Sequence, residues 1–120
     1  MTIEEIERIV ARELESYSYE KPAPEATIGV AWSEEKVLSY IPKLKKALVT
    51  PRLRQFRVTT DAEYRGTETF EDYWIVAEDH GYVQWYDPKS NEFGLGEESA
   101  GGGFSSIGVR GDLVGVYCAM

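Results

Sequence analysis

The sequence feature that most constrains the fold is an aromatic-rich stretch at residues 72–94, which reads DYWIVAEDHGYVQWYDPKSNEFG. Side chains at residues 73–78 alternate with a period of two, which predicts a β-strand whose two faces are used differently. The tripeptide Asp79-His80-Gly81 follows, and its glycine can adopt the positive φ of a tight hairpin turn. The chain is therefore expected to reverse direction at this point.

Residues 82–86 form the predicted return strand, in which three of five positions are aromatic. Residues 87–91 predict a second turn, because Asp87 and Pro88 suit its first two positions and Asn91 tolerates a left-handed conformation. Phe93 then opens a third strand. The whole stretch predicts a three-stranded antiparallel meander.

Two helices are predicted before the meander. Thr2 and Glu5 form a capping box at the start of the first helix, which runs for about four turns. In the second helix, residues 34–48 place apolar side chains on one face after Ser33 at the N-cap position. Pro42 lies inside this pattern and predicts two helical pieces, 34–40 and 42–48. The stripe of the first helix comprises Ile3, Ile6, Val10, Leu14 and Tyr17.

The remaining segments supply short strands and loops. Strands are predicted at residues 27–32, 53–60 and 104–109. Residues 94–103 contain five glycines and are predicted to be a mobile loop that buries little. The tail, residues 111–120, fits either a buried strand or a helix capped by Asp112, and the Gly-Asp pair favours the helix.

This order of elements predicts a single α+β domain covering residues 1–120. We expect a mixed or antiparallel sheet of about five strands, with the aromatic meander at its centre and the N-terminal helices packed on one face. Either Tyr73 or Trp74, whichever faces the helices, is expected to be buried against Ile6, Val10 and Leu44.

The charge of the chain limits its partners. The formal net charge is −8, and residues 61–98 contain eleven acidic and two basic residues. Such a chain repels nucleic-acid phosphates and anionic membranes and attracts a basic partner.

The sequence lacks an apolar run of the roughly 18 residues that a membrane-spanning helix needs. Its acidic N-terminus is unlike a signal peptide, and Cys118 is the single cysteine. We therefore expect a soluble, cytoplasmic protein.

Few residues suggest catalysis. One histidine, His80, and one cysteine give neither a nucleophile pair nor a metal site with recognised ligand spacing. The acids of residues 61–72 do not match a calcium loop, and residues 101–103 are not followed by the lysine of a phosphate loop. We therefore predict no cofactor, no metal and no catalytic residue. Whether the protein is an enzyme stays open, and the balance is against it.

The first functional hypothesis is an interaction domain for a basic protein. In size, acidity and lack of catalytic residues the chain resembles the immunity proteins of bacterial toxin systems, although it shares no motif with them. The resemblance implies a toxin domain as the partner. The expected contact residues are the acids Asp61, Glu63, Glu68, Glu71, Asp72, Glu78 and Asp79, with Tyr82 and Trp85 as exposed aromatic anchors.

The alternative is a small enzyme or ligand-binding domain that uses carboxylates in a cleft beside the aromatic strands. A deep pocket with converging polar groups favours this alternative, whereas a flat acidic face favours a protein partner. The sequence makes no prediction of the oligomeric state.

Overall fold

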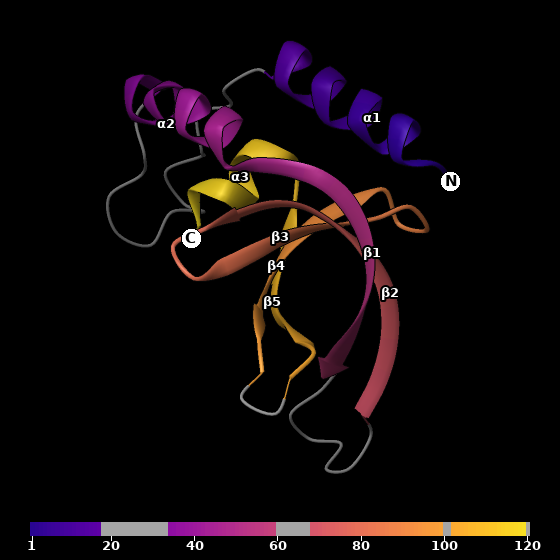
Figure 1. Cartoon of the computed structure of the whole chain (residues 1–120). Helices are drawn as coiled ribbons and strands as arrows, with labels where there is room; N and C mark the ends of the chain where they lie inside the picture. The colour runs from indigo at the N-terminus through magenta and orange to yellow at the C-terminus, as the bar shows by residue number, and fades with distance from the viewer. Residues whose placement is uncertain (18–33, 60–67, 100–101, 120) are drawn as a thin grey trace.

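The structure is a computed structural model that describes residues 1–17, 34–59, 68–99 and 102–119. The fold is α+β, as predicted, with helices packed on a mixed sheet (Figure 1). In chain order the elements are α1 (Ile3–Ser16), α2 (Glu34–Ala47), β1 (Leu48–Thr59), β2 (Glu68–Asp79), β3 (Tyr82–Asp87), β4 (Glu92–Glu98), β5 (Phe104–Gly111) and α3 (Leu113–Cys118).

The described strands form a meander that closes on itself as a barrel in the order β1-β2-β3-β4-β5. Each consecutive pair is antiparallel, and β1 and β5 then meet in a parallel pairing at Phe56 with Phe104 and Arg57 with Ser105. The parallel closure follows from the odd number of strands, because the first and last strands of a five-strand meander run in the same direction. The sequence pattern predicted the strands but not their closure.

Closure explains why both faces of the meander are apolar. The face inside the barrel holds an aromatic cluster in which the rings of Tyr73 and Trp85 are stacked, with centroids 4.0 Å apart. The other face is covered by helices, and Trp74 is the aromatic on that side; it packs against the cluster that contains Ile6, Val10 and Leu44, but it is half-buried and not buried as predicted. The interior cluster comprises Phe56, Val58, Tyr73, Ile75, Val83 and Trp85.

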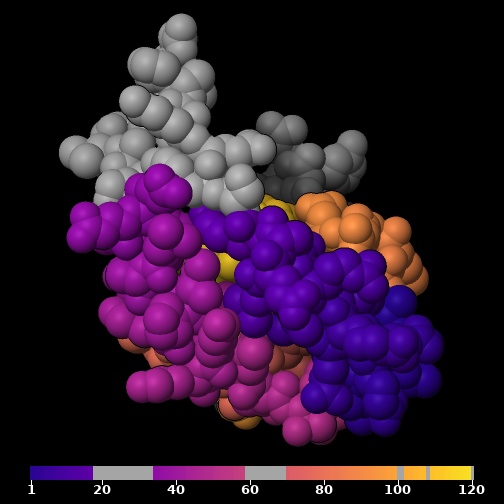
Figure 2. All heavy atoms as spheres, turned by 90° about the horizontal axis from the view of Figure 1, so that it is seen from above, coloured from indigo at the N-terminus to yellow at the C-terminus, as the bar shows by residue number. Residues whose placement is uncertain are grey.

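The helices lie together on the outer face of the sheet. Figure 2 shows α1 and α2 side by side from above, with α3 visible between them. The predicted cap of α1 is confirmed, since the Thr2 hydroxyl accepts a hydrogen bond from the Glu5 N–H at 3.2 Å. The α3 helix is confirmed as well: the Asp112 side chain caps it by accepting from the Gly115 N–H, and Leu113 is fully buried.

The predicted break in the second helix is wrong. The α2 helix is continuous from Glu34 to Ala47 and contains Pro42. Proline removes the N–H that would bond the carbonyl of the residue four positions earlier, which is Leu38. Both residues are exposed, so water can satisfy that carbonyl, and the buried face carried by Val37 and Leu44 holds the helix together.

The predicted mobile loop at residues 94–103 is wrong for its first half, because β4 extends to Glu98. Gly94 and Gly96 are buried inside the barrel, where a Cβ atom at either position would overlap the ring of Trp85 or Phe56. These glycines make room for aromatic side chains instead of loosening the chain. Residues 100–101 lie outside the described residues.

The other boundaries shift in smaller ways. The strand predicted from residue 53 begins at Leu48, and Pro51 lies at a register irregularity of β1, where a ladder can tolerate it. Both predicted turns are confirmed by the positive φ angles of His80, Gly81 and Asn91. The strand predicted at residues 27–32 lies outside the described residues. The same is true of Ser33 and Met120.

Candidate functional site

A pocket of about 380 Å³ opens beside the hairpin that joins β2 and β3. Its lining comes from β1, from both strands of the hairpin, and from the ends of β4 and β5 that face each other. The residues that line it are Arg52, Glu78, Asp79, Gly81, Tyr82, Val83, Glu98 and Phe104.

The strand pairing shows that this pocket is the mouth of the barrel. Val83 pairs with Glu78 on one side, and Glu98 pairs with Phe104. Residues directly opposite each other in a ladder point to the same face of the sheet, so these four side chains share the inner face. Val83 belongs to the buried interior cluster, and Phe104 packs against it. The floor of the pocket is therefore apolar and continuous with the barrel core.

The rim of the pocket is acidic. Three carboxylates and one guanidinium line it, which gives a formal charge of −2. Glu78 is paired with Arg52, and both side chains are more than a third exposed, so this ion pair contributes little to folding. Glu98 is exposed and has no hydrogen-bond or ion-pair partner within the described ranges. It is the carboxylate that is free to meet a ligand.

Asp79 is held in place from two directions. The Tyr117 hydroxyl donates to its Oδ2 at 2.6 Å, and the His80 N–H donates to its Oδ1 at 2.9 Å. The hydrogen bond from Tyr117 is the main reason why the pKa of Asp79 lies below its ordinary value. Burial, together with this hydrogen bond, raises the pKa of Tyr117. Asp79 therefore stays ionised at neutral pH and joins the hairpin to α3.

An aromatic ring completes the lining. Phe104 is half-buried, and its ring lies 5.3 Å from that of Phe56, inclined at 31°. Tyr82 also borders the pocket, but it pairs with Asp79 directly across the hairpin, so its side chain lies on the opposite face of the sheet from Glu78 and Val83. The pocket thus combines ionised carboxylates with aromatic surface, which is the chemistry of cation recognition.

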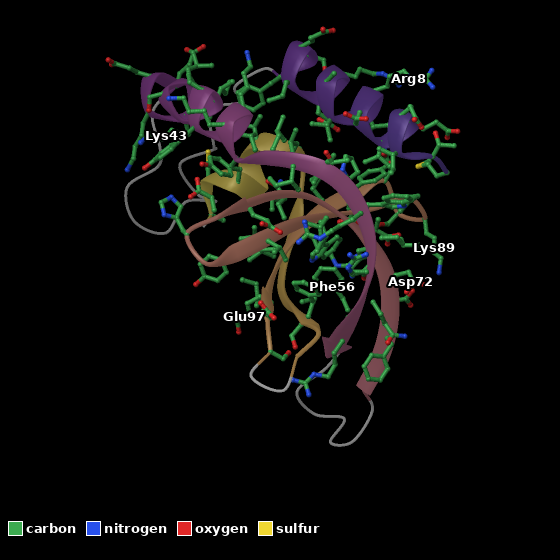
Figure 3. The ribbon with its side chains drawn as sticks, in the orientation of Figure 1. Arg8, Lys43, Phe56, Asp72, Lys89 and Glu97 are labelled. Atoms are coloured by element: carbon green, nitrogen blue, oxygen red, sulfur yellow. The ribbon has the colours of Figure 1, made fainter. Side chains whose placement is uncertain are left out.

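The structure gathers part of the predicted contact set. Glu78, Asp79 and Tyr82 line the pocket together. Glu71 and Asp72 do not: Glu71 accepts a hydrogen bond from Lys89 at 3.3 Å, and Figure 3 shows Asp72 and Lys89 on the side of the barrel away from Glu97. Asp61, Glu63 and the side chain of Glu68 lie outside what the structure describes.

The expectation that Trp85 is an exposed anchor is wrong. Its side chain is fully buried inside the barrel, and its indole N–H donates to the Leu95 carbonyl at 3.0 Å. A partner could reach it only by opening the barrel. Tyr82 is the aromatic of the predicted pair that remains accessible.

Five lining residues were absent from the predicted contact set: Arg52, Gly81, Val83, Glu98 and Phe104. Arg52 lies just before the predicted strand, and Glu98 lies in the segment that the sequence predicts to be a loop. Glu98 lies two residues after Gly96 on β4, so the two residues share a face of the strand. This places Glu98 in the pocket only once the pairing of Gly96 with Val83 is known.

Other features of the described residues suggest less. A smaller hollow of about 170 Å³ between α1 and β1 is mostly apolar, with residues such as Val10, Leu14 and Val49, and Glu7 is its acidic member. No group of three metal-ligating side chains occurs in the described part of the chain. Within the same ranges, none of the helices has the length and apolar character needed to cross a membrane.

Comparisons of the chain with models of known protein families, with curated proteins and with solved structures found no match. The chemistry of the pocket is therefore the basis for assigning a function.

Proposed function

We propose that this protein is an interaction domain that binds a basic protein partner, and that the barrel-mouth pocket receives a cationic side chain of that partner. The observation that carries the proposal is the carboxylate of Glu98, which has no partner among the described residues, in a pocket with a formal charge of −2. A cation entering there gains a charge-assisted contact without first breaking an existing ion pair.

The exposure of the pocket lining favours a protein over a small molecule. Glu78, Gly81 and Glu98 are exposed, whereas Val83 is the buried member of the lining. Small-molecule sites cover most of the ligand surface, and an open rim does not. A side chain that belongs to a protein can bind in an open pocket, because the partner's surface around that side chain excludes water from the contact.

The charge of the whole chain supports the same partner chemistry. A formal net charge of −8 attracts a basic protein over a distance and raises the association rate. A bacterial immunity protein that neutralises a basic toxin domain is the specific form of this proposal. Its support is the small size, the acidity and the acidic pocket.

A second candidate is a binding site or active site for a small cationic molecule. The pocket volume of about 380 Å³ falls in the range of roughly 300–1,000 Å³ that is typical of ligand sites, and three acidic residues line it. This candidate predicts saturable binding of a small amine by the isolated protein. The protein-partner proposal predicts that such amines bind weakly and that a macromolecule is needed.

The proposal can be tested with two variants that make the same charge change on neighbouring residues. Glu98→Gln removes the free carboxylate of the pocket, and Glu97→Gln removes the next charge along β4, which the alternation of the strand places on the outer face. The wild-type protein would be used as bait in its native host, and binding of the captured partner would then be measured for all three proteins.

Both variants should slow association similarly, because each reduces the net negative charge by one, and added salt should remove this effect. The Glu98→Gln variant alone should speed dissociation, by about tenfold, because it loses a contact to a charged group. Equal dissociation rates in the two variants, or a partner that is itself acidic, would refute the proposal.

A further inference from the structure

We propose that the barrel-mouth pocket selects arginine over lysine in its partner. This inference rests on the proposed function and names the group that the pocket receives. It follows from the lining, in which the Glu98 carboxylate, which has no partner among the described residues, shares the inner face with the Phe104 ring beside an existing guanidinium–carboxylate pair.

The aromatic lining distinguishes the two cations. A guanidinium is planar, weakly hydrated and able to stack on a ring face, whereas the ammonium of lysine is compact and strongly hydrated. Phe104 is half-buried and lies on the same face as Glu98, so its ring offers surface to the pocket. A cation that stacks there loses little hydration if it is arginine and more if it is lysine.

The Arg52–Glu78 pair shows that this rim already holds a guanidinium. Arg52 donates from its Nη2 to the Glu78 Oε1, and both residues line the pocket. An incoming arginine is therefore offered the free Glu98 carboxylate directly, and it competes with Arg52 for Glu78. Removing Arg52 should then strengthen the binding of arginine, which is the opposite of what an anion-binding pocket would show.

The probes are three capped pentapeptides of glycine with a single central residue: arginine, lysine, or citrulline, which has the shape of arginine without its charge. Each is titrated into the full-length, isotope-labelled protein, and the backbone amide signals of Gly81, Tyr82, Glu98 and Phe104 are followed by NMR. The same titrations are run on Glu98→Gln, on the control Glu97→Gln and on Arg52→Gln. Circular dichroism checks that each variant is folded.

The arginine peptide should move these signals and bind about three- to fivefold more tightly than the lysine peptide, the size of an exposed cation–π contact. Citrulline should leave them unchanged. Arginine binding should be weakened in Glu98→Gln, unchanged in Glu97→Gln and about threefold tighter in Arg52→Gln.

The possible failures separate the two proposals. If lysine binds as tightly as arginine at these four residues, the selection of arginine is refuted while an acidic recognition pocket stands. If neither charged peptide moves these signals at millimolar concentration, the pocket is not a cation site and the proposed function fails with it. Weaker arginine binding in Arg52→Gln would refute the competition between Arg52 and the ligand.

Discussion

Replacing Gly94 with alanine tests whether the stack inside the barrel has the geometry described above. A Cβ atom at this position would lie 2.1 Å from the Cζ2 atom of Trp85 and 2.5 Å from both Cε2 and Cη2. Carbon atoms pack at about 3.5–4.0 Å, so the indole must move by more than about 1 Å. It is fixed by the Tyr73 ring, stacked at a centroid distance of 4.0 Å, and by its hydrogen bond to the Leu95 carbonyl.

The size of the effect follows from three contributions. Overpacking a dense core costs about 1–3 kcal/mol. Losing the indole hydrogen bond costs roughly 0.5–1.5 kcal/mol. Alanine restricts the unfolded chain, which offsets about 0.4–1 kcal/mol. Gly94→Ala should therefore lower the free energy of unfolding by about 2–3 kcal/mol in urea titrations followed by circular dichroism.

Gly81→Ala serves as the matched control. A Cβ atom there has nothing within 4 Å, and the positive φ of +80° is the source of the penalty. Its expected cost is about 1–2 kcal/mol, the usual cost of the left-handed conformation for an L-residue. In a Trp85→Leu background Gly94→Ala should become nearly neutral, because the shorter side chain vacates the space, whereas Gly81→Ala should cost the same as before. Additive effects of Gly94→Ala and Trp85→Leu would refute the clash.

The remaining predictions concern the helices and the hairpin. Pro42→Ala should raise the free energy of unfolding by about 1 kcal/mol or more, because it restores a hydrogen bond inside a continuous helix; a loss of stability would refute the continuity of α2. Asp112→Ala should cost about 1 kcal/mol through the lost cap of α3, as measured by thermal unfolding, and an unchanged midpoint would contradict the cap. Tyr117→Phe should raise the pKa of Asp79 toward its ordinary value, which carboxyl ¹³C NMR can follow. Because the folded-state pKa of Asp79 is lowered, its contribution to stability is present above the unfolded pKa of about 3.9 and is lost as the pH falls through the folded value. The difference in stability between wild type and this variant should therefore shrink in acid, and a constant difference would contradict the assignment.

The elements that could be predicted are those governed by local rules. The β2–β3 turn follows from Gly81, whose positive φ angle the sequence anticipates. The cap of α3 follows from Asp112, whose short carboxylate reaches the free N–H groups of the first turn. In each case the residues that decide the structure are neighbours in the chain, so no knowledge of the tertiary fold is needed.

The role of the glycines could not be predicted in this way. A glycine-rich stretch indicates a flexible loop only when nothing packs against it. Gly94 and Gly96 are instead required because Trp85 and Phe56, from two other strands, fill the space beside them. Glycine therefore indicates flexibility in a loop but close packing inside a barrel. Which of the two applies depends on whether the sheet closes.

The acidic contact set could also be predicted only in part, because residues that are close in sequence can lie far apart along a strand. Glu71 and Glu78 both lie on β2, seven residues apart, and an extended strand rises about 3.3 Å per residue, so their backbones are separated by roughly 20 Å. Acids that are close in sequence are therefore spread along the strand, and Glu71 interacts with Lys89 instead of with the pocket. Glu98 comes from another strand and reaches the pocket because β4 pairs with both β3 and β5. A charged stretch of sequence predicts the sign of a partner's charge, whereas the place where that partner binds is set by which strands end at the same mouth of the barrel.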